Sequence, residues 1–424
     1  MERSGFTRRG FLKTTTALGI GAGWLGGTHL YLKDDRWTPN RSFWVSRGRA
    51  AVNPPLKGAE TADVAIIGGG VTGLSTALHL LTRHPGLKVV LLEAQYAGFG
   101  ATGRSGGVLG DGTEIGEPEG TDDNVAHVME IIDKHGISCD LEHEPATQLD
   151  PYKYAVGLKG AIERLGARVF EGSRVEAIRR GALVELLGDG FSLQAPQLVV
   201  ATNGYTPRLG IAPERIAPVH TGAAVTPPLS KELLRDIPDA ILVHTSPEMY
   251  MWGRKTPDGR VLVGAGAKYF YGDGLYHSGE PWLFRALHRL MERTFPGLAG
   301  YPFEHSWTGP MGATSDQEPI IGRLGGAAGG RLGGGAGGRL GGGARSSPGP
   351  GEGNIFYGGA YSGHGIAMGT KMGSFLAAYL EEERPPAWLL RPTVPMPPEP
   401  FRYAGVNMVI NMMNLGLYHM PKHD

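Results

Sequence analysis

The sequence of 424 residues has little that points to a disulfide-linked, metal-binding or nucleic-acid-binding protein. It contains one cysteine, Cys139, which excludes an internal disulfide framework and a zinc site built from several cysteines. Its 41 lysines and arginines balance 41 aspartates and glutamates, so the formal net charge gives no reason to expect a nucleic acid as the main partner. We therefore predict no metal site and no nucleic-acid partner.

Long apolar runs are also missing at the N-terminus. The uncharged stretch 14–32 contains five glycines and a histidine, which makes it a poor permanent membrane span. It follows the run T-R-R-G-F-L-K at residues 7–13, which has every position of a twin-arginine leader. We predict that residues 1–35 direct the folded protein through the twin-arginine export machinery to the periplasm or cell envelope. No clear cleavage site follows, so an uncleaved leader could anchor it there. The alternative is a basic tail with a chance Arg-Arg pair.

Glycine, in contrast, is abundant, with 69 residues. One group lies within residues 63–93, where an apolar strand, a G-x-G-x-x-G turn, an amphipathic helix and a second apolar strand follow one another. This order predicts a βαβ dinucleotide-binding unit rather than a glycine-rich turn in an unrelated fold. Gly68 permits the tight turn, Gly70 lets the backbone approach a pyrophosphate, and Gly73 lets the helix pack closely on the sheet.

The second strand of this unit ends at Glu93, 20 residues after Gly73. A carboxylate at this position accepts hydrogen bonds from the adenosine ribose and repels a 2′-phosphate. The phosphates would face the helix N-terminus, whose N–H groups favour an anion. The motif by itself leaves FAD and NAD both open.

Four further segments narrow this choice. The loop G-F-G-A-T-G-R-S-G-G at residues 98–107 resembles the G-A-S-G-R-N-G-G loop of FAD-dependent oxidoreductases of the D-amino-acid-oxidase-like family. Residues 173–178 and 354–366 are similar to that family's adenine-side strand and C-terminal flavin signature, and residues 307–322 match another of its segments. The nearest branch is the glutamylputrescine, glycine and sarcosine oxidase-like one. The resemblance implies FAD as the cofactor.

The resemblance also implies the fold. We expect an α/β protein with a discontinuous, Rossmann-like FAD-binding domain and a smaller substrate domain on a mixed or antiparallel β-sheet. The expected parts of the FAD-binding domain are residues 60–107, 147–220 and 305–384, the last with a flexible glycine-rich insert at 322–353. The other expected parts are an acidic helical segment at 108–146 that is shorter than the family's usual cap, the substrate domain at 221–304, and a proline-rich linker with an amphipathic helix at 385–424.

The same resemblance assigns cofactor contacts. The family's first loop runs along the flavin, which implies that Arg104, Ser105 and Gly107 lie at the cofactor. The second segment implies that the backbone of Val175 meets the adenine. For Arg104 the alternative is an arginine that only forms a salt bridge within its loop.

The C-terminal signature implies a backbone contact with the pyrimidine end of the flavin. Gly363, Gly365 and Ile366 would supply N–H groups that stabilise the reduced, anionic ring. The candidate catalytic residues are His364, the ionisable side chain of the signature, and Lys268, since some relatives place a lysine over flavin N5. The alternatives are a histidine that only packs and a solvated lysine.

The chemistry implied by the family is oxidation of the CH–NH bond of an amine or amino acid. A hydride passes to flavin N5, and water hydrolyses the resulting imine. We expect non-covalent FAD, because the Cys and Trp-His attachment sites of some relatives are absent, and O₂ or a membrane quinone as acceptor. Ala367 stands where sarcosine-oxidase-like relatives have a lysine for the substrate carboxylate. The rivals are a quinone-linked dehydrogenase and a non-catalytic FAD-binding protein with a truncated cap.

The acidic segment at residues 108–144 has eleven acidic side chains against one lysine. Because it follows the flavin loop, we hypothesise that its charge favours a cationic amine or polyamine, with Glu114, Glu117 and Glu119 as the residues to test. The alternative is an acidic, solvated helix and loop, in which residues 125–132 supply one apolar helix face and Gly136 ends the helix.

Two further segments have a predicted structure. Three copies of an eight-residue unit within residues 322–345 predict a flexible loop between two strands of the FAD-binding domain, with a partner-binding role for its arginines as the alternative. In the tail, one apolar stripe is formed by Val406, Ile410, Met413 and Leu417, and another face carries Asn407, Asn411 and Asn414. We expect this helix to pack back onto the protein, with docking on a membrane surface as the alternative.

Overall fold

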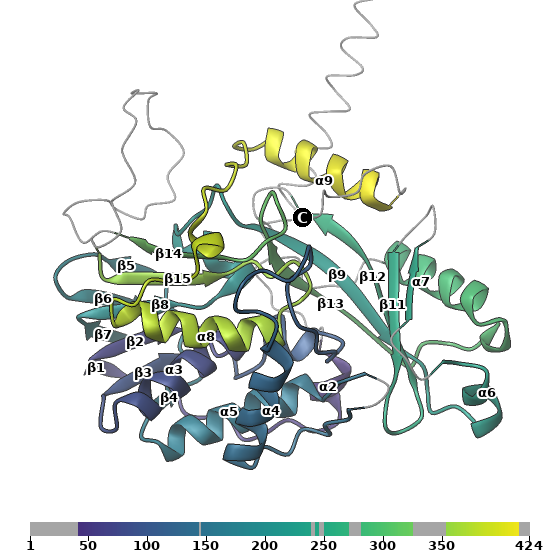
Figure 1. Cartoon of the computed structure of the whole chain (residues 1–424), viewed down its shortest axis with the longest axis horizontal. Coiled ribbons are helices and arrows are strands. Elements are labelled where there is room, and N and C mark those ends of the chain that lie inside the picture. Colours follow the sequence, from purple (N-terminus) through teal and green to yellow (C-terminus); the bar gives the residue numbers. More distant parts are fainter. Residues whose placement is uncertain are drawn as a thin grey trace, which may run out of the picture.

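The computed structural model describes residues 41–143, 146–238, 242–245, 250–270, 281–324 and 353–414. The predicted export leader and residues 325–352 of the glycine-rich insert lie outside these ranges. Figure 1 shows two units side by side, one built on a parallel sheet with its helices and one on an antiparallel sheet, with a C-terminal helix across the top. Among the helices of the described chain, none has the length and apolarity needed to cross a membrane.

A six-stranded sheet forms the centre of the first unit. Its strands in spatial order are β14 (Ile320–Leu324), β15 (Ile355–Gly359), β8 (Gln197–Val200), β2 (Val64–Ile67), β3 (Val89–Leu92) and β4 (Arg168–Phe170). All neighbours are parallel except β14 and β15. Strands β2 and β3 are buried throughout and wholly aliphatic, as is expected of strands covered on both faces. The glycine-rich insert stands in the sequence between β14 and β15.

Helices cover one face of this sheet, and a second sheet covers the other. Val64 and Ile66 of β2 pack against the helices, whereas Ala65 and Ile67 pack against the second sheet, as the alternation of a strand requires. The helices are α3 (Val71–Arg83), α4 (Asn124–His135), α5 (Pro151–Arg164) and α8 (Ala367–Leu380). The strands of the second sheet in order are β1 (Gly58–Thr61), β7 (Phe191–Ala195), β6 (Val184–Gly188) and β5 (Ala177–Arg179).

The predicted helix of the acidic segment is α4. Val128 and Ile132 are buried on its inner face, and the helix ends at Gly136, whose φ of 62° is left-handed. The described part of the segment thus has an ordinary amphipathic helix. Glu130 and Asp133 lie in this helix, and the other described acidic residues lie in the loops on either side.

A five-stranded antiparallel sheet forms the second unit. Its strands in order are β10 (Leu242–Thr245), β11 (Tyr250–Lys255), β12 (Val261–Tyr269), β9 (Ala217–Val225) and β13 (His305–Ala313). Helix α7 (Pro281–Thr294) packs on one face, where Leu287 and Met291 are fully buried. The antiparallel substrate sheet was expected, in a domain at residues 221–304. Strands β9 and β13 are nine residues long and pair along their whole length, so the sheet extends from 217 to 313.

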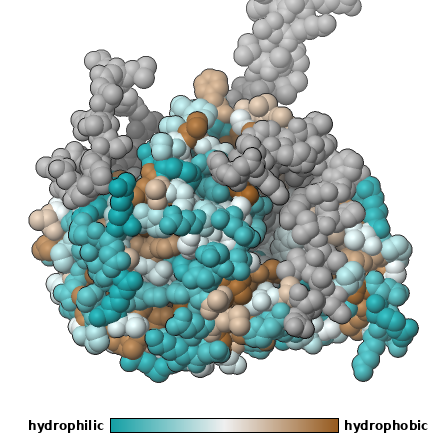
Figure 2. Space-filling view, viewed as in Figure 1, coloured by the Kyte–Doolittle hydropathy of each residue, from teal (hydrophilic) through white to brown (hydrophobic). Residues whose placement is uncertain are grey.

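The C-terminal helix α9 (Phe401–Asn414) packs back onto the protein, as expected. Ile410 is buried in a cluster with residues of β9 and β12, whereas Phe401 and Met408 are exposed by 68% and 59%. Figure 2 shows apolar atoms at the upper edge of a mostly hydrophilic face, where α9 lies in Figure 1. The remaining short helices are α2 (Phe43–Ser46), α6 (Lys231–Arg235), η1 (Thr102–Arg104), η2 (Asn203–Leu209), η3 (Pro296–Leu298) and η4 (Ala387–Leu390).

Candidate active site

A large cavity lies between the two units. Its volume is about 1490 Å³, which exceeds the roughly 300–1,000 Å³ of pockets for one small ligand. The carboxyl ends of β2 and β8 and the first turn of α3 form one side, and the inner residues of β9, β12 and β13 form the other. The carboxyl ends of parallel strands are where open α/β sheets bind ligands. The space suits a cofactor and a substrate together.

The turn between β2 and α3 needs its glycines. A Cβ atom on Gly73 would lie 2.1 Å from the carbonyl oxygen of Gly68, and one on Gly68 would lie 2.6 Å from the carbonyl oxygen of Ala201. Gly68 also has a φ of +115°. Gly70 is the N-cap of α3 and adds no side chain between the helix end and the cavity that it lines. The turn therefore has the space and the helix dipole that a pyrophosphate requires.

Glu93 lies beside this turn, at the end of β3. Its Oε2 accepts a hydrogen bond from the Gly69 N–H at 2.7 Å, and its Oε1 accepts one from the Gln95 N–H at 2.8 Å. Burial raises the pKa of Glu93 to about 7, although these backbone hydrogen bonds lower it in part. Glu93 lines the cavity, and each carboxylate oxygen has a second acceptor site. It can thus accept hydrogen bonds from ribose hydroxyls.

This geometry predicts a pH dependence of cofactor binding. Since the ionised carboxylate is the stronger acceptor for a ribose hydroxyl, FAD affinity of the wild type is expected to fall about tenfold as the pH drops from about 8 to about 5.5. A Glu93→Gln variant has no such group to titrate. Its affinity should be lower at pH 8 and nearly constant over the same range. Fluorescence titration of apoprotein with FAD measures both, and a parallel pH profile of the variant would contradict the assignment.

The loop at residues 98–107 is fixed by buried contacts. Gly107 has a φ of 72°, and a Cβ there would lie 2.1 Å from the carbonyl oxygen of Leu149. Arg104 and Ser105 line the cavity with it. The Arg104 guanidinium donates to the carbonyl oxygens of Phe99 and Thr308 at 2.9 and 2.8 Å, so it ties the loop to β13. Burial lowers the pKa of Arg104.

Residues 360–366 have an unusual backbone. Ala360 and Ser362 have φ values of 67° and 51°, and Gly363 has 135°. The Asn203 side chain accepts a hydrogen bond from the Ala360 N–H at 2.9 Å, which helps to hold this conformation. The hydroxyl of Ser362 is buried at the cavity and has no hydrogen-bond partner within the described chain. A buried hydroxyl without a partner fits a polar ligand such as FAD.

His364 lies next to these residues and contacts Glu114 of the acidic segment. The imidazole Nδ1 is 2.8 Å from Oε2 of the carboxylate, and both side chains line the cavity with exposures of 40% and 32%. Gly110 and Gly363 leave room for the pair, since a Cβ on either would lie within 4 Å of it. The structure thus places the candidate residue His364 in contact with one glutamate of the acidic segment.

The structure places most of the other predicted site residues at the cavity. Val175, Gly365 and Ile366 line it. Lys268 does not, and its ammonium nitrogen lies 5.0 Å from the centre of the Phe270 ring. The structure therefore does not place Lys268 at the cavity, where the resemblance led us to expect it. A bulge in β12 between Ala265 and Ala267 is the cause, because it pairs Lys268 with His220 of β9, which faces away from the cavity.

Two residues of β11 that support the loop at 98–107 could not be predicted from the sequence. Arg254 is 1% exposed, and its guanidinium donates to the carbonyl oxygens of Gly106 and Leu149 at 3.0 and 3.2 Å. Burial lowers its pKa to about 10. The ring of Trp252 lines the cavity and packs so closely on Gly106 that a Cβ there would lie 2.4 Å from it. Both side chains support the loop at 98–107 from a strand that is far away in the sequence. No short sequence motif indicates such contacts.

Comparisons with known proteins agree with this geometry. The model of the family described as FAD dependent oxidoreductase (DAO) matches residues 63–148 and 141–379. The γ-glutamylputrescine oxidoreductase of Escherichia coli K12 is 27% identical over 84% of this chain and 92% of its own length. The probable oxidoreductase OrdL of Haemophilus influenzae is 25% identical over 80% and 87%.

Solved structures show the same fold. Glycine oxidase from Geobacillus kaustophilus superposes with a TM-score of 0.60 at 17% identity, over 77% of this chain and 96% of that protein. L-proline dehydrogenase from P. horikoshii gives 0.59 at 16% identity, over 76% and 94%. The glycine turn, the buried Ser362 hydroxyl, which has no hydrogen-bond partner among the described residues, and the family match lead to one conclusion. The chain belongs to the FAD-dependent oxidoreductase family.

Proposed function

We propose that the protein oxidises the CH–NH bond of a substrate that presents a cationic amine. The observation that carries this proposal is the carboxylate of Glu114, held by His364 at the cavity beside the C-terminal signature. A carboxylate has about four lone-pair sites, so the bond to His364 leaves acceptor capacity for an ammonium group. Glu117 and Glu119 do not line the cavity, so the structure narrows the proposed anchor to Glu114.

The first residue of α8 also favours an amine as the substrate. Ala367 is buried at the cavity, and its methyl side chain cannot hold a carboxylate as the lysine of sarcosine-oxidase-like relatives would. The named activity of the E. coli relative concerns a γ-glutamyl derivative of putrescine, which is likewise an amine. We therefore favour an amine or polyamine over a simple amino acid.

The chain's own residues bind, orient and exclude water. Bound FAD supplies the acceptor for the hydride that leaves the carbon beside nitrogen. The glycine turn and Glu93 would hold its pyrophosphate and ribose, while Ser362 and the backbone of 363–366 would face its ring. The substrate nitrogen must reach the ring as a neutral amine. The His364–Glu114 pair can accept the proton that an ammonium loses.

The experiment is an anaerobic screen of the purified yellow holoprotein. Putrescine, other primary amines, N-methyl amino acids and D-amino acids are added in turn, and bleaching of the flavin absorbance is followed. The proposal expects a diamine or another primary amine to bleach the flavin fastest. Faster bleaching by amino acids would overturn the amine preference, and bleaching by none would favour the non-catalytic rival.

The electron acceptor and the cellular location of the protein can be tested as well. We propose O₂ or a membrane quinone as acceptor, and peroxide release during aerobic turnover with the best amine separates an oxidase from a quinone-linked dehydrogenase. We propose export on the basis of the leader pattern at residues 7–13. Fractionation of cells that express the full chain tests it, since a cytoplasmic holoprotein would contradict export.

A further inference from the structure

The segment that follows α8 forms part of the cavity wall. The family match ends at residue 379, yet the cavity lining continues at 394–397 and in α9. We call residues 391–400 the strap, because they connect the first unit to α9. The strap and α9 therefore lie beyond the part of the chain that the family model describes, and they face the same cavity as the glycine turn.

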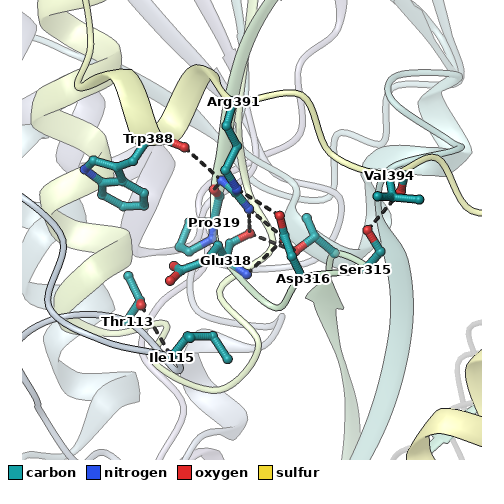
Figure 3. A network of polar contacts seen from close by, with 10 residues as sticks. Thr113, Ile115, Ser315, Asp316, Glu318, Pro319, Trp388, Arg391 and Val394 are labelled. Carbon is teal, nitrogen blue, oxygen red and sulfur yellow. Dashed lines mark hydrogen bonds and ion pairs between the residues drawn. The ribbon is translucent and has the colours of Figure 1, made fainter. Parts of the chain in front are cut away.

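The strap is fastened at its start. Arg391 donates from two nitrogens to the two carboxylate oxygens of Asp316, at 2.9 and 2.6 Å, and also to the carbonyl oxygen of Pro319 at 2.7 Å. Figure 3 shows the Arg391 side chain inserted among these groups, with Ser315 bonded to the Val394 carbonyl further along. A bidentate arginine–carboxylate pair is rigid as well as strong. The strap is thus a fixed part of the wall.

Helix α9 is fastened at the end of β12. The Asn407 side chain donates to the carbonyl oxygen of Tyr269 at 2.9 Å and accepts a hydrogen bond from the Tyr269 N–H at 3.0 Å. The amide of Asn407 thus pairs with the edge of the sheet as a strand residue would. On the next turn, Ile410 is 8% exposed and packs with residues of β9. These contacts fix the orientation of α9 and therefore determine which of its faces lines the cavity.

We propose that α9 is the substrate-side wall of the cavity and that Gly405 sets the depth of the substrate pocket. Gly405 lines the cavity, and a Cβ built on it meets no atom within 4 Å. The lining residues after it are Val406, Met408, Val409 and Ile410, all apolar. The charged lining residue of α9 is Arg402, whose Nε donates to the carbonyl oxygen of Pro397 at 3.1 Å. The wall therefore accepts an alkyl chain beyond the reacting amine. This inference rests on the proposed function for the identity of the amine but not for the position of the wall.

The test fills the space beside Gly405. A Gly405→Phe variant of the full-length holoprotein is compared with wild type in anaerobic flavin reduction by n-propylamine, n-hexylamine and n-octylamine. We expect KM for n-octylamine to rise about tenfold or more, and KM for n-propylamine to stay within about twofold. Ala404→Phe is the matched control, since Ala404 is the exposed neighbour outside the cavity lining. Equal KM values for wild type and Gly405→Phe across the series would overturn the proposal.

A second measurement needs no substrate. The native Cys139 is 2% exposed and burial raises its pKa to about 12, so it will not compete for a thiol reagent. Gly405→Cys and Ala404→Cys holoproteins are each labelled with octyl methanethiosulfonate. The wall predicts a shifted flavin absorbance band for the label at 405 and none at 404.

The two measurements separate the possible failures. If no amine bleaches the wild-type flavin but the label at 405 shifts the band, the proposed function is wrong and the wall stands. If the labels at 405 and 404 leave the band equally unchanged, α9 does not face the flavin cavity and the proposal is overturned.

Discussion

A Gly73→Ala variant is expected to purify without FAD, as a colourless protein. The added Cβ would lie 2.1 Å from the carbonyl oxygen of Gly68 and 3.3 Å from a side-chain carbon of Ile66. Both neighbours are fixed, because Gly68 is bound to Leu92 through its N–H and Ile66 is fully buried in β2. Helix α3 must move away from the sheet or the turn must open, and either change displaces the amides that face the pyrophosphate. We expect FAD affinity to fall at least about a hundredfold, or ~2.7 kcal/mol.

The control for this variant is Gly116→Ala. Gly116 has a φ outside the left-handed region, and a Cβ built there meets no atom within 4 Å. This variant should bind FAD as the wild type does. Absorbance at the flavin band, FAD titration of the apoprotein and a thermal melt separate loss of cofactor from loss of fold. A yellow Gly73→Ala protein with wild-type FAD affinity would show that the turn at 68–73 is not the phosphate site.

The glycine turn could be predicted because its constraint is local. Gly68 and Gly73 are five residues apart, and their contact follows from the strand, turn and helix that their own neighbours form. The same holds for Glu93, which ends the strand paired directly with β2. The antiparallel substrate sheet came from the resemblance, but its boundaries did not. Strands β9 and β13 extend toward the other unit, and their amino-acid composition does not change where the expected domain boundary lies.

The rest of the site depends on contacts that sequence spacing does not encode. Glu114 and His364 are 250 residues apart in the sequence. The sequence indicated each of them as a candidate site residue, but not that their side chains are in contact. Lys268 lies outside the cavity lining because one extra residue in β12 reverses which face the following side chains occupy. The apolar stripe of α9 predicted that the helix packs, but an apolar face looks the same whether it packs on a core or lines a cavity. Only the position of β12 against the helix decides that.

The effect that most directly tests the amine anchor is that of Glu114→Gln. With putrescine as substrate we expect kcat/KM to fall by about tenfold to a hundredfold, because a hydrogen bond to a charged group contributes ~1.5–3 kcal/mol. Most of the loss should be in KM, since the ammonium is bound before the reaction begins. The variant should also reduce the dependence of kcat/KM on ionic strength, because salt screens an attraction that the amide no longer exerts.

Glu117→Gln is the matched control, since Glu117 is an exposed glutamate of the same segment that lies outside the cavity lining. It removes the same charge three residues away, so it measures what the acidic segment does by long-range attraction alone. If Glu117→Gln changes KM and the salt dependence as much as Glu114→Gln does, the segment steers cations without a specific anchor. If neither variant changes KM for putrescine, the carboxylate beside His364 does not bind the amine, and a substrate without a cationic group must be sought. A fall limited to Glu114→Gln, with the flavin absorbance and FAD affinity unchanged, identifies Glu114 as the residue that holds the amine at the flavin.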